Sequence, residues 1–173
     1  MKNNQGFTLI ELIVVIAIMA IIAGISGRSL SSVSNQEAKD FINTYNALLS
    51  ECKVETTSGM PSPGIRLQIK DGEYQAVLYK TVIEEEDDGS VTQREEIVRT
   101  EVLGEDHLIC KFGAKEATYE ELSKFERNTT LDVKFDRATG QINTTFTKIS
   151  ISNGRKIYYI ELIPETGYHR IVQ

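Results

Sequence analysis

Cysteine is scarce in this chain, and its positions exclude the common cysteine-based sites. The two cysteines, Cys52 and Cys110, stand far apart in the sequence. Their spacing matches neither a zinc motif nor a C-x-x-C redox pair. They can form one disulfide if the domain lies outside the cytoplasm, and the alternative is a pair of buried free thiols.

Basic residues are outnumbered by acidic ones. The chain has 19 lysines and arginines against 25 aspartates and glutamates, which gives a net charge of −6. Proteins that track a phosphate backbone usually carry a basic excess. Arg155, Lys156 and Arg170 could gather into a small basic patch, but few aromatic residues lie between them for bases to stack on. We therefore do not expect nucleic acid as a partner.

Recognisable catalytic and metal-binding motifs are missing too. No strained nucleophile elbow is present, and His169 stands alone near the C-terminus. His107 and Cys110 form only half of a metal site, unless Cys52 lies close by. The acidic run 84–88 could hold calcium but lacks the alternating spacing of a ligand loop, so a solvated hairpin tip is the stronger prediction. We expect no enzyme, no metal site and no cofactor.

The front of the chain contains "GFTLIELIVVIAIMAIIAG", an apolar stretch that holds a single charge, Glu11. Residues 7–27 include no proline, so they can form a helix of about 21 residues that spans ~30 Å, the thickness of a bilayer core. Placing a carboxylate at that depth costs roughly 2.5–3.5 kcal/mol or more unless another group neutralises its charge. The pattern predicts a transmembrane helix with an acid that needs a partner.

Three interpretations fit this segment. It can be a secretory signal peptide that is removed after the apolar region. It can be a plain N-terminal anchor, which leaves Glu11 unexplained. It can also be a helix that stays with the protein and uses Glu11 to find a partner.

The stretch "MKNNQGFTLIELIVVIAIMAIIAG" resembles the prepilin N-terminus of type IV pilins and type II secretion pseudopilins. In that family a short basic leader ends in glycine, a prepilin peptidase cuts after this glycine, and the new N-terminal residue is methylated on its amine. The matching positions here are Gly6 for the cut and Phe7 for the methylated residue. Glu11 becomes the fifth residue of the processed chain. Scattered turns, such as "FDRATG", are similar to those of H-type minor pseudopilins and minor pilins.

The resemblance gives Glu11 a physical role. Cleavage leaves a cationic amine on Phe7, and the Glu11 carboxylate of one subunit can neutralise the Phe7 amine of its neighbour in a low-dielectric helix bundle. The expected partners are prepilin peptidase, other pilin or pseudopilin subunits, an assembly platform in the cytoplasmic membrane, and membrane lipid before assembly. The expected location is the cytoplasmic membrane, with the N-terminus inside, and then an extracytoplasmic filament.

Beyond residue 28 the helical pattern becomes one-sided. Apolar residues recur at steps of three and four, which predicts a helix face that packs on a sheet: Leu30, Val33, Phe41, Ile42, Tyr45, Leu48, Leu49 and Cys52. We expect a nearly continuous helix from about Phe7 to Lys53. The alternative is a membrane helix, a serine-rich linker and a separate amphipathic helix.

Strand signals fill the rest of the chain. Asp71-Gly72 and Asn153-Gly154 lie between alternating runs and predict hairpins. Residues 117–126 predict a short helix with a Thr118–Glu121 capping box. The predicted fold is α+β, with a long N-terminal helix, transmembrane in its first half, packed on one antiparallel sheet.

The predicted organisation has four parts: a leader at 1–6, a transmembrane or filament-core helix at 7–27, an amphipathic helix half at 28–53, and a β-rich globular domain at 54–173. The expected function is a non-enzymatic subunit of a type IV pilus or related filament. A pseudopilin of a type II secretion or competence system is the alternative. A membrane-tethered adhesin or ligand-binding module that does not polymerise is a different class.

Overall fold

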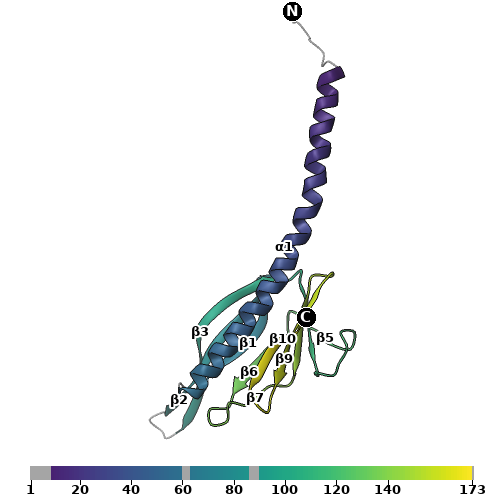
Figure 1. Ribbon diagram of the computed structural model, residues 1–173. Coiled ribbons are helices and arrows are strands. Elements are labelled where there is room, and N and C mark those ends of the chain that lie inside the picture. Colours follow the sequence, from purple (N-terminus) through teal and green to yellow (C-terminus); the bar gives the residue numbers. More distant parts are fainter. Residues whose placement is uncertain (1–8, 60–62, 86–89, 173) are drawn as a thin grey trace, which may run out of the picture. The chain divides into compact units, whose positions relative to one another are not determined.

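The computed structural model describes residues 9–59, 63–85 and 90–172, and it describes only the backbone at residues 22–34. The described chain is α+β, with an N-terminal helix followed by antiparallel strands (Figure 1). It divides into two units, Met1–Gln36 and Glu37–Gln173. Every strand belongs to the second unit. The bounds of the strands are β1 Pro63–Lys70, β2 Glu73–Glu85, β3 Val91–Glu105, β4 Ile109–Gly113, β5 Ser123–Lys124, β6 Leu131–Phe135, β7 Ile142–Asn143, β8 Lys148–Ser152, β9 Ile157–Ile163 and β10 Tyr168–Val172.

Helix α1 runs from Leu9 to Thr57 as one element of 49 residues. The serine-rich segment 31–34 keeps helical backbone, so the alternative with a linker is wrong. The helix ends where Gly59 takes a φ of +100°, a left-handed conformation that glycine adopts at little cost. The helix therefore ends slightly beyond the predicted Lys53, just before the glycine whose left-handed conformation lets the chain change direction.

The strands form two five-stranded sheets, whereas the sequence predicted one. The first sheet has the order β3-β2-β1-β6-β7, and the second has the order β10-β9-β8-β4-β5. The segment 142–151 is divided between the sheets. Its start is β7 in the first sheet, and its end is β8 in the second. Phe146 lies between these two strands and is buried in the core.

The β1–β2 hairpin forms as predicted. Lys70 pairs with Glu73, so Asp71 and Gly72 make a two-residue turn. Both turn residues have positive φ, 55° and 82°, as this tight hairpin geometry requires. This turn sets the register in which β1 and β2 pair in the first sheet.

The second half of α1 packs on both sheets (Figure 1). One hydrophobic core contains its inward residues together with strand residues of each sheet. The predicted stripe is buried within the described residues, and Leu30 and Val33 lie outside the side chains that the structure describes. The buried hydrophobic residues of the described helix are Ala38, Phe41, Ile42, Tyr45, Leu48, Leu49 and Cys52.

The short helix predicted at residues 117–126 is absent, which corrects the sequence analysis. The segment forms turns and the two-residue strand β5. The predicted capping contact is nevertheless made, because the Thr118 N–H and hydroxyl both donate to the Glu121 carboxylate, at 2.8 and 2.9 Å. These bonds lower the pKa of Glu121. Leu122 and Phe125 are buried, and their burial favours a path along the sheet over a helix.

Candidate functional site

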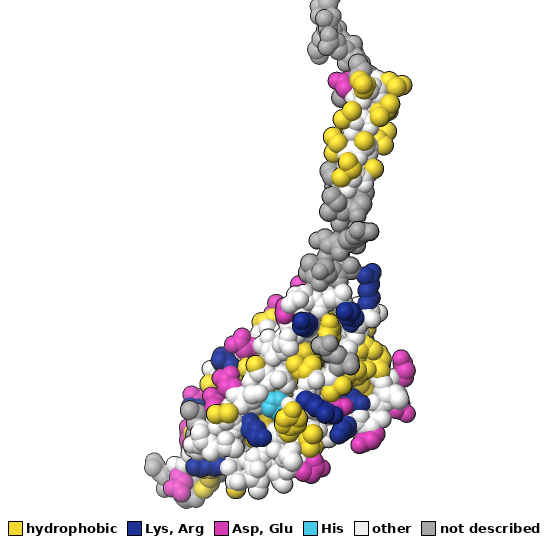
Figure 2. All heavy atoms as spheres, viewed as in Figure 1, with side chains coloured by type: hydrophobic (Ala, Val, Ile, Leu, Met, Phe, Trp, Pro, Cys, Tyr) yellow, Lys and Arg dark blue, Asp and Glu magenta, His cyan; other side chains and the backbone are white. Residues whose placement is uncertain are grey.

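Every residue of the first described stretch of α1, residues 9–21, is exposed, and apolar side chains cover the face of this stretch seen in Figure 2. Exposure of its large hydrophobic residues runs from 47% at Val15 to 78% at Leu9. A helix in a protein interior buries one stripe, whereas a helix that is apolar all round needs an apolar environment on all sides. This stretch therefore presents apolar surface that the described chain does not cover.

Glu11 lies in the first turn of this helix and is exposed. A carboxylate near a helix N-terminus is stabilised by the unpaired N–H groups of the first turn. The predicted cleavage and methylation positions, Gly6 and Phe7, lie outside the described residues. Among the residues that the structure does describe, no helix carries an apolar run of the length needed to cross a membrane.

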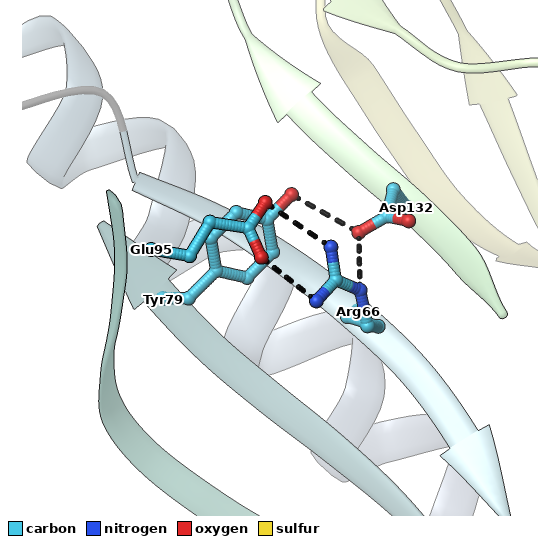
Figure 3. Close-up of polar contacts among 4 residues, drawn as sticks. All are labelled: Arg66, Tyr79, Glu95 and Asp132. Carbon is cyan, nitrogen blue, oxygen red and sulfur yellow. Dashed lines mark hydrogen bonds and ion pairs between the residues drawn. The ribbon is translucent and has the colours of Figure 1, made fainter. Parts of the chain in front are cut away.

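A second polar feature, which the sequence analysis missed, joins four strands of the first sheet (Figure 3). Arg66 of β1 donates from Nη1 and Nη2 to the Glu95 carboxylate of β3, at 2.9 and 3.2 Å. Its Nε donates to Oδ1 of Asp132 on β6, at 2.9 Å. Tyr79 of β2 donates its hydroxyl to the same Asp132 oxygen at 3.0 Å. We call Arg66, Tyr79, Glu95 and Asp132 the polar cluster.

Charge pairing dominates the electrostatics of the polar cluster. The hydrogen bonds from Arg66 lower the pKa of Glu95, and the bond to Glu95 raises the pKa of Arg66. Burial, followed by the Asp132 charge, raises the pKa of Tyr79. At neutral pH Glu95 is thus held as a carboxylate, Arg66 as a cation and Tyr79 as a neutral phenol. The cluster ties four strands together and offers no activated nucleophile or base.

No sequence motif could have revealed the polar cluster, because its members lie on four different strands. The only local signal is the polar residue Arg66 between the apolar Ile65 and Leu67, which places its side chain on the opposite face of β1. Strand pairing, which aligns Arg66 with Asp132, then brings the charges together.

The two cysteines are free and buried, so the disulfide that their spacing allowed is not formed in this structure. Burial raises the pKa of Cys52 to about 12 and also raises that of Cys110. Both thiols are therefore protonated and apolar in character. They belong to the hydrophobic core that joins α1 to the sheets.

His107 and Cys110 do not share an environment. His107 is half exposed, and its two ring nitrogens face Glu37 and Glu105. Cys110 is fully buried in the core. Over residues 9–59, 63–85 and 90–172, no group of three or more His, Cys, Asp or Glu residues is placed to hold a metal ion.

The acidic run is only partly described. Glu84 pairs with Arg94 across the β2–β3 ribbon at 3.0 Å, and Glu85 is exposed at the end of β2. Residues 86–88 lie outside the described residues.

The basic residues near the C-terminus do not form one patch of free charge. Arg170 on β10 donates to Glu161 on β9, with the shorter contact at 2.8 Å. Arg155 and Lys156 are exposed in the β8–β9 turn. Their N–H groups bond the Asn153 side-chain oxygen at 3.0 Å each, so the local backbone is a closed turn.

His169 packs against α1. Its Nε2 lies 2.9 Å from the Ser50 hydroxyl, which also donates to the Asn46 carbonyl at 3.1 Å. Burial is the main cause of a lowered pKa for His169, so the ring is neutral at pH 7. Because the Ser50 hydroxyl is shared with the helix backbone, this contact ties β10 to α1 and does not create a nucleophile.

Comparison with known proteins identifies one feature. Residues 1–27 match a family model described as the prokaryotic N-terminal methylation motif. No curated protein and no solved structure matches the chain.

Proposed function

We propose that this chain, whose N-terminal methylation motif supports a place among the type IV pilins and pseudopilins, is a non-enzymatic subunit of a type IV pilus or related filament. One observation carries the proposal. The matched motif at residues 1–27 includes the start of α1, whose described first turns at residues 9–21 expose their apolar side chains. Neighbouring helices in a filament core would bury that surface.

The proposed maturation begins at the leader. Prepilin peptidase removes residues 1–6 by cutting after Gly6, and the new amine of Phe7 is then methylated. The chemistry is done to this chain by other proteins. The sequence of residues 7–27 supports a single crossing of the cytoplasmic membrane before assembly, with the N-terminus on the cytoplasmic side.

Glu11 is the proposed assembly residue. Within a filament its carboxylate pairs with the Phe7 amine of a neighbouring subunit. Each charge alone is costly in an apolar bundle, and removing one member of such a buried pair leaves the other uncompensated. The pair therefore selects the axial register between subunits.

The proposed partners are prepilin peptidase, the assembly platform in the cytoplasmic membrane, lipid, and other pilin or pseudopilin subunits. In this proposal residues 7–27 are the filament-core helix, 28–53 the amphipathic half of the helix, and 54–173 the β-rich domain. Two alternative functions predict different experimental results. A pseudopilin of a secretion or competence system would be processed in the same way, whereas a tethered adhesin or binding module would keep its domain at the membrane and would not polymerise.

Intact mass measurement of the membrane-extracted protein tests maturation. The proposal expects a chain that begins at Phe7 with one added methyl group. A mature chain that still begins at Met1, or one that begins beyond residue 27, would contradict it.

Assembly is tested with Glu11→Gln, which keeps the size of the side chain and removes the charge. We expect this variant to be processed at Gly6 but to be depleted at least tenfold from sheared filaments. Glu55→Gln, the same change near the other end of α1, is the matched control and should assemble normally. Equal incorporation of both variants would refute the role of Glu11.

A further inference from the structure

The turn between β8 and β9 contains the asparagine–glycine sequence of this chain, Asn153-Gly154. Ser152 and Ile157 pair where the two strands meet this turn. Gly154 has a φ of +84°, and a Cβ built on it would meet no atom within 4 Å. Gly154 and the two residues after it are exposed, so water reaches the backbone of the turn.

The side-chain carbonyl of Asn153 accepts two backbone hydrogen bonds. The N–H groups of Arg155 and Lys156 both donate to its Oδ1, at 3.0 Å each. Two such donors stabilise negative charge that develops on the oxygen, as the donors of an oxyanion hole do. They also draw electron density from Cγ, so the amide carbon of Asn153 is a better electrophile in this turn.

The backbone nitrogen of Gly154 is the nucleophile within reach of that carbon, because the two atoms can close a five-membered ring. Its N–H donates to the Ser152 hydroxyl at 3.0 Å. A hydroxyl is both an acceptor and a donor. Once the amide proton is lost, the Ser152 hydroxyl can therefore rotate and donate its own hydrogen to the anionic nitrogen. Glycine carries no side chain to crowd the attack.

We propose that Asn153 is a site of spontaneous deamidation that the folded β8–β9 turn promotes. Hydroxide removes the Gly154 amide proton, and the nitrogen pair forms a bond to Cγ of Asn153 while the carbonyl electrons move onto Oδ1. The intermediate collapses as the Cγ–Nδ2 bond breaks, and the leaving nitrogen takes a proton from water and departs as ammonia. Water then opens the cyclic imide at either of its carbonyls, which leaves a carboxylate at position 153.

The modification changes the charge of an exposed turn. An aspartate at position 153 keeps an acceptor for the N–H groups of Arg155 and Lys156, and its negative charge offsets part of the positive charge of their side chains. The isoaspartyl product instead adds a carbon to the backbone, which disturbs the pairing of Ser152 with Ile157. This inference does not depend on the proposed filament function.

Peptide mapping by mass spectrometry of the full chain, aged in detergent at pH 8, tests the proposal. The peptide that holds Asn153 should gain the mass of an amide-to-acid conversion. The internal control is Asn128, which is exposed in a turn but is followed by Thr129. Asn153 should convert roughly tenfold faster or more, because the β-branched threonine crowds the attacking nitrogen. Conversion of Asn153 no faster than that of Asn128 in the folded chain would overturn the proposal.

The part played by the fold is tested with Ser152→Ala, which removes the hydroxyl beside the Gly154 nitrogen. In the folded chain this variant should deamidate about three- to tenfold more slowly than the parent, the effect of one lost hydrogen bond. In urea, where the turn is absent, the two chains should react at the same rate. Ser150→Ala, the same change two residues earlier on β8, is the matched control and should keep the parent rate. Equal rates for the parent and Ser152→Ala in their folded states would overturn the promotion by the turn.

Discussion

The ring of Tyr79 lies over the α-carbon of Gly64, its direct partner across the β1–β2 hairpin. A Cβ placed on Gly64 would come within 2.7 Å of the Tyr79 ring and hydroxyl. The ring is held there by its bond to Asp132 and by the Arg66 guanidinium, 4.7 Å from the ring centre. An aromatic residue thus covers a strand glycine, which protects the backbone that glycine leaves bare.

Gly64→Ala should destabilise the protein by about 1–3 kcal/mol, because the added methyl group must displace a ring that three strands hold in place. Urea unfolding of the whole chain in detergent, followed by circular dichroism, measures the loss. Gly113→Ala is the matched control. Its Cβ would meet the flexible end of Leu122 at 2.9 Å, so the cost should be smaller. Equal losses of stability in the two variants would show that the Tyr79 ring moves aside as easily as the Leu122 side chain.

Replacing Arg66 should weaken the fold in a pH-dependent way. The pKa of Glu95 is lowered in the folded state by Arg66, so its contribution exists above about pH 4.3, the ordinary glutamate pKa, and fades as pH falls through the folded value. Arg66→Gln should therefore cost roughly 0.5–1 kcal/mol at pH 7 and less at pH 3, since the cluster is partly exposed. Urea unfolding at the two pH values measures this difference. A cost that is the same at both would mean that Arg66 acts through packing alone.

His169 should make the fold sensitive to mild acid. Burial lowers its pKa in the folded state, so the unfolded chain binds the proton more readily. Stability from this group is complete above the unfolded value of about 6.5 and is lost as pH falls below it. The free energy of unfolding should drop between pH 7.5 and 5.5, and His169→Gln should remove that drop. Both chains should carry His107→Gln, so that His169 is the histidine that differs between them. A drop of the same size in both would contradict this assignment.

Cys52 and Cys110 should resist alkylation in the folded protein. Both are buried, and burial raises the pKa of each thiol, so little thiolate forms at pH 8. Mass spectrometry after iodoacetamide treatment without reductant should find no adduct on the native chain and two adducts after unfolding in urea. Rapid labelling of the native chain would contradict the burial. Absence of labelling in urea would reveal a disulfide.

The interior of the fold could be predicted only in part. Asp71-Gly72 predicted its hairpin because both residues tolerate positive φ, a purely local requirement. Thr118 and Glu121 form the predicted capping hydrogen bonds, yet the segment is not helical, because burial of Phe125 outweighs the local preference for a helix. The division of the strands into two sheets was not predicted, because it follows from which strands pair across the whole domain and no local pattern encodes that pairing.

By itself the sequence determined the α+β class, the motif at residues 1–27 and the apolar stripe of α1, because each rests on the period or identity of neighbouring residues. The tertiary structure alone decided the polar cluster and the His107 contacts. Arg66 meets Asp132, and His107 meets Glu37, only after strands and helix from distant parts of the chain pack on one core. Charge contacts across such sequence distances follow from packing, and packing is a property of the whole fold.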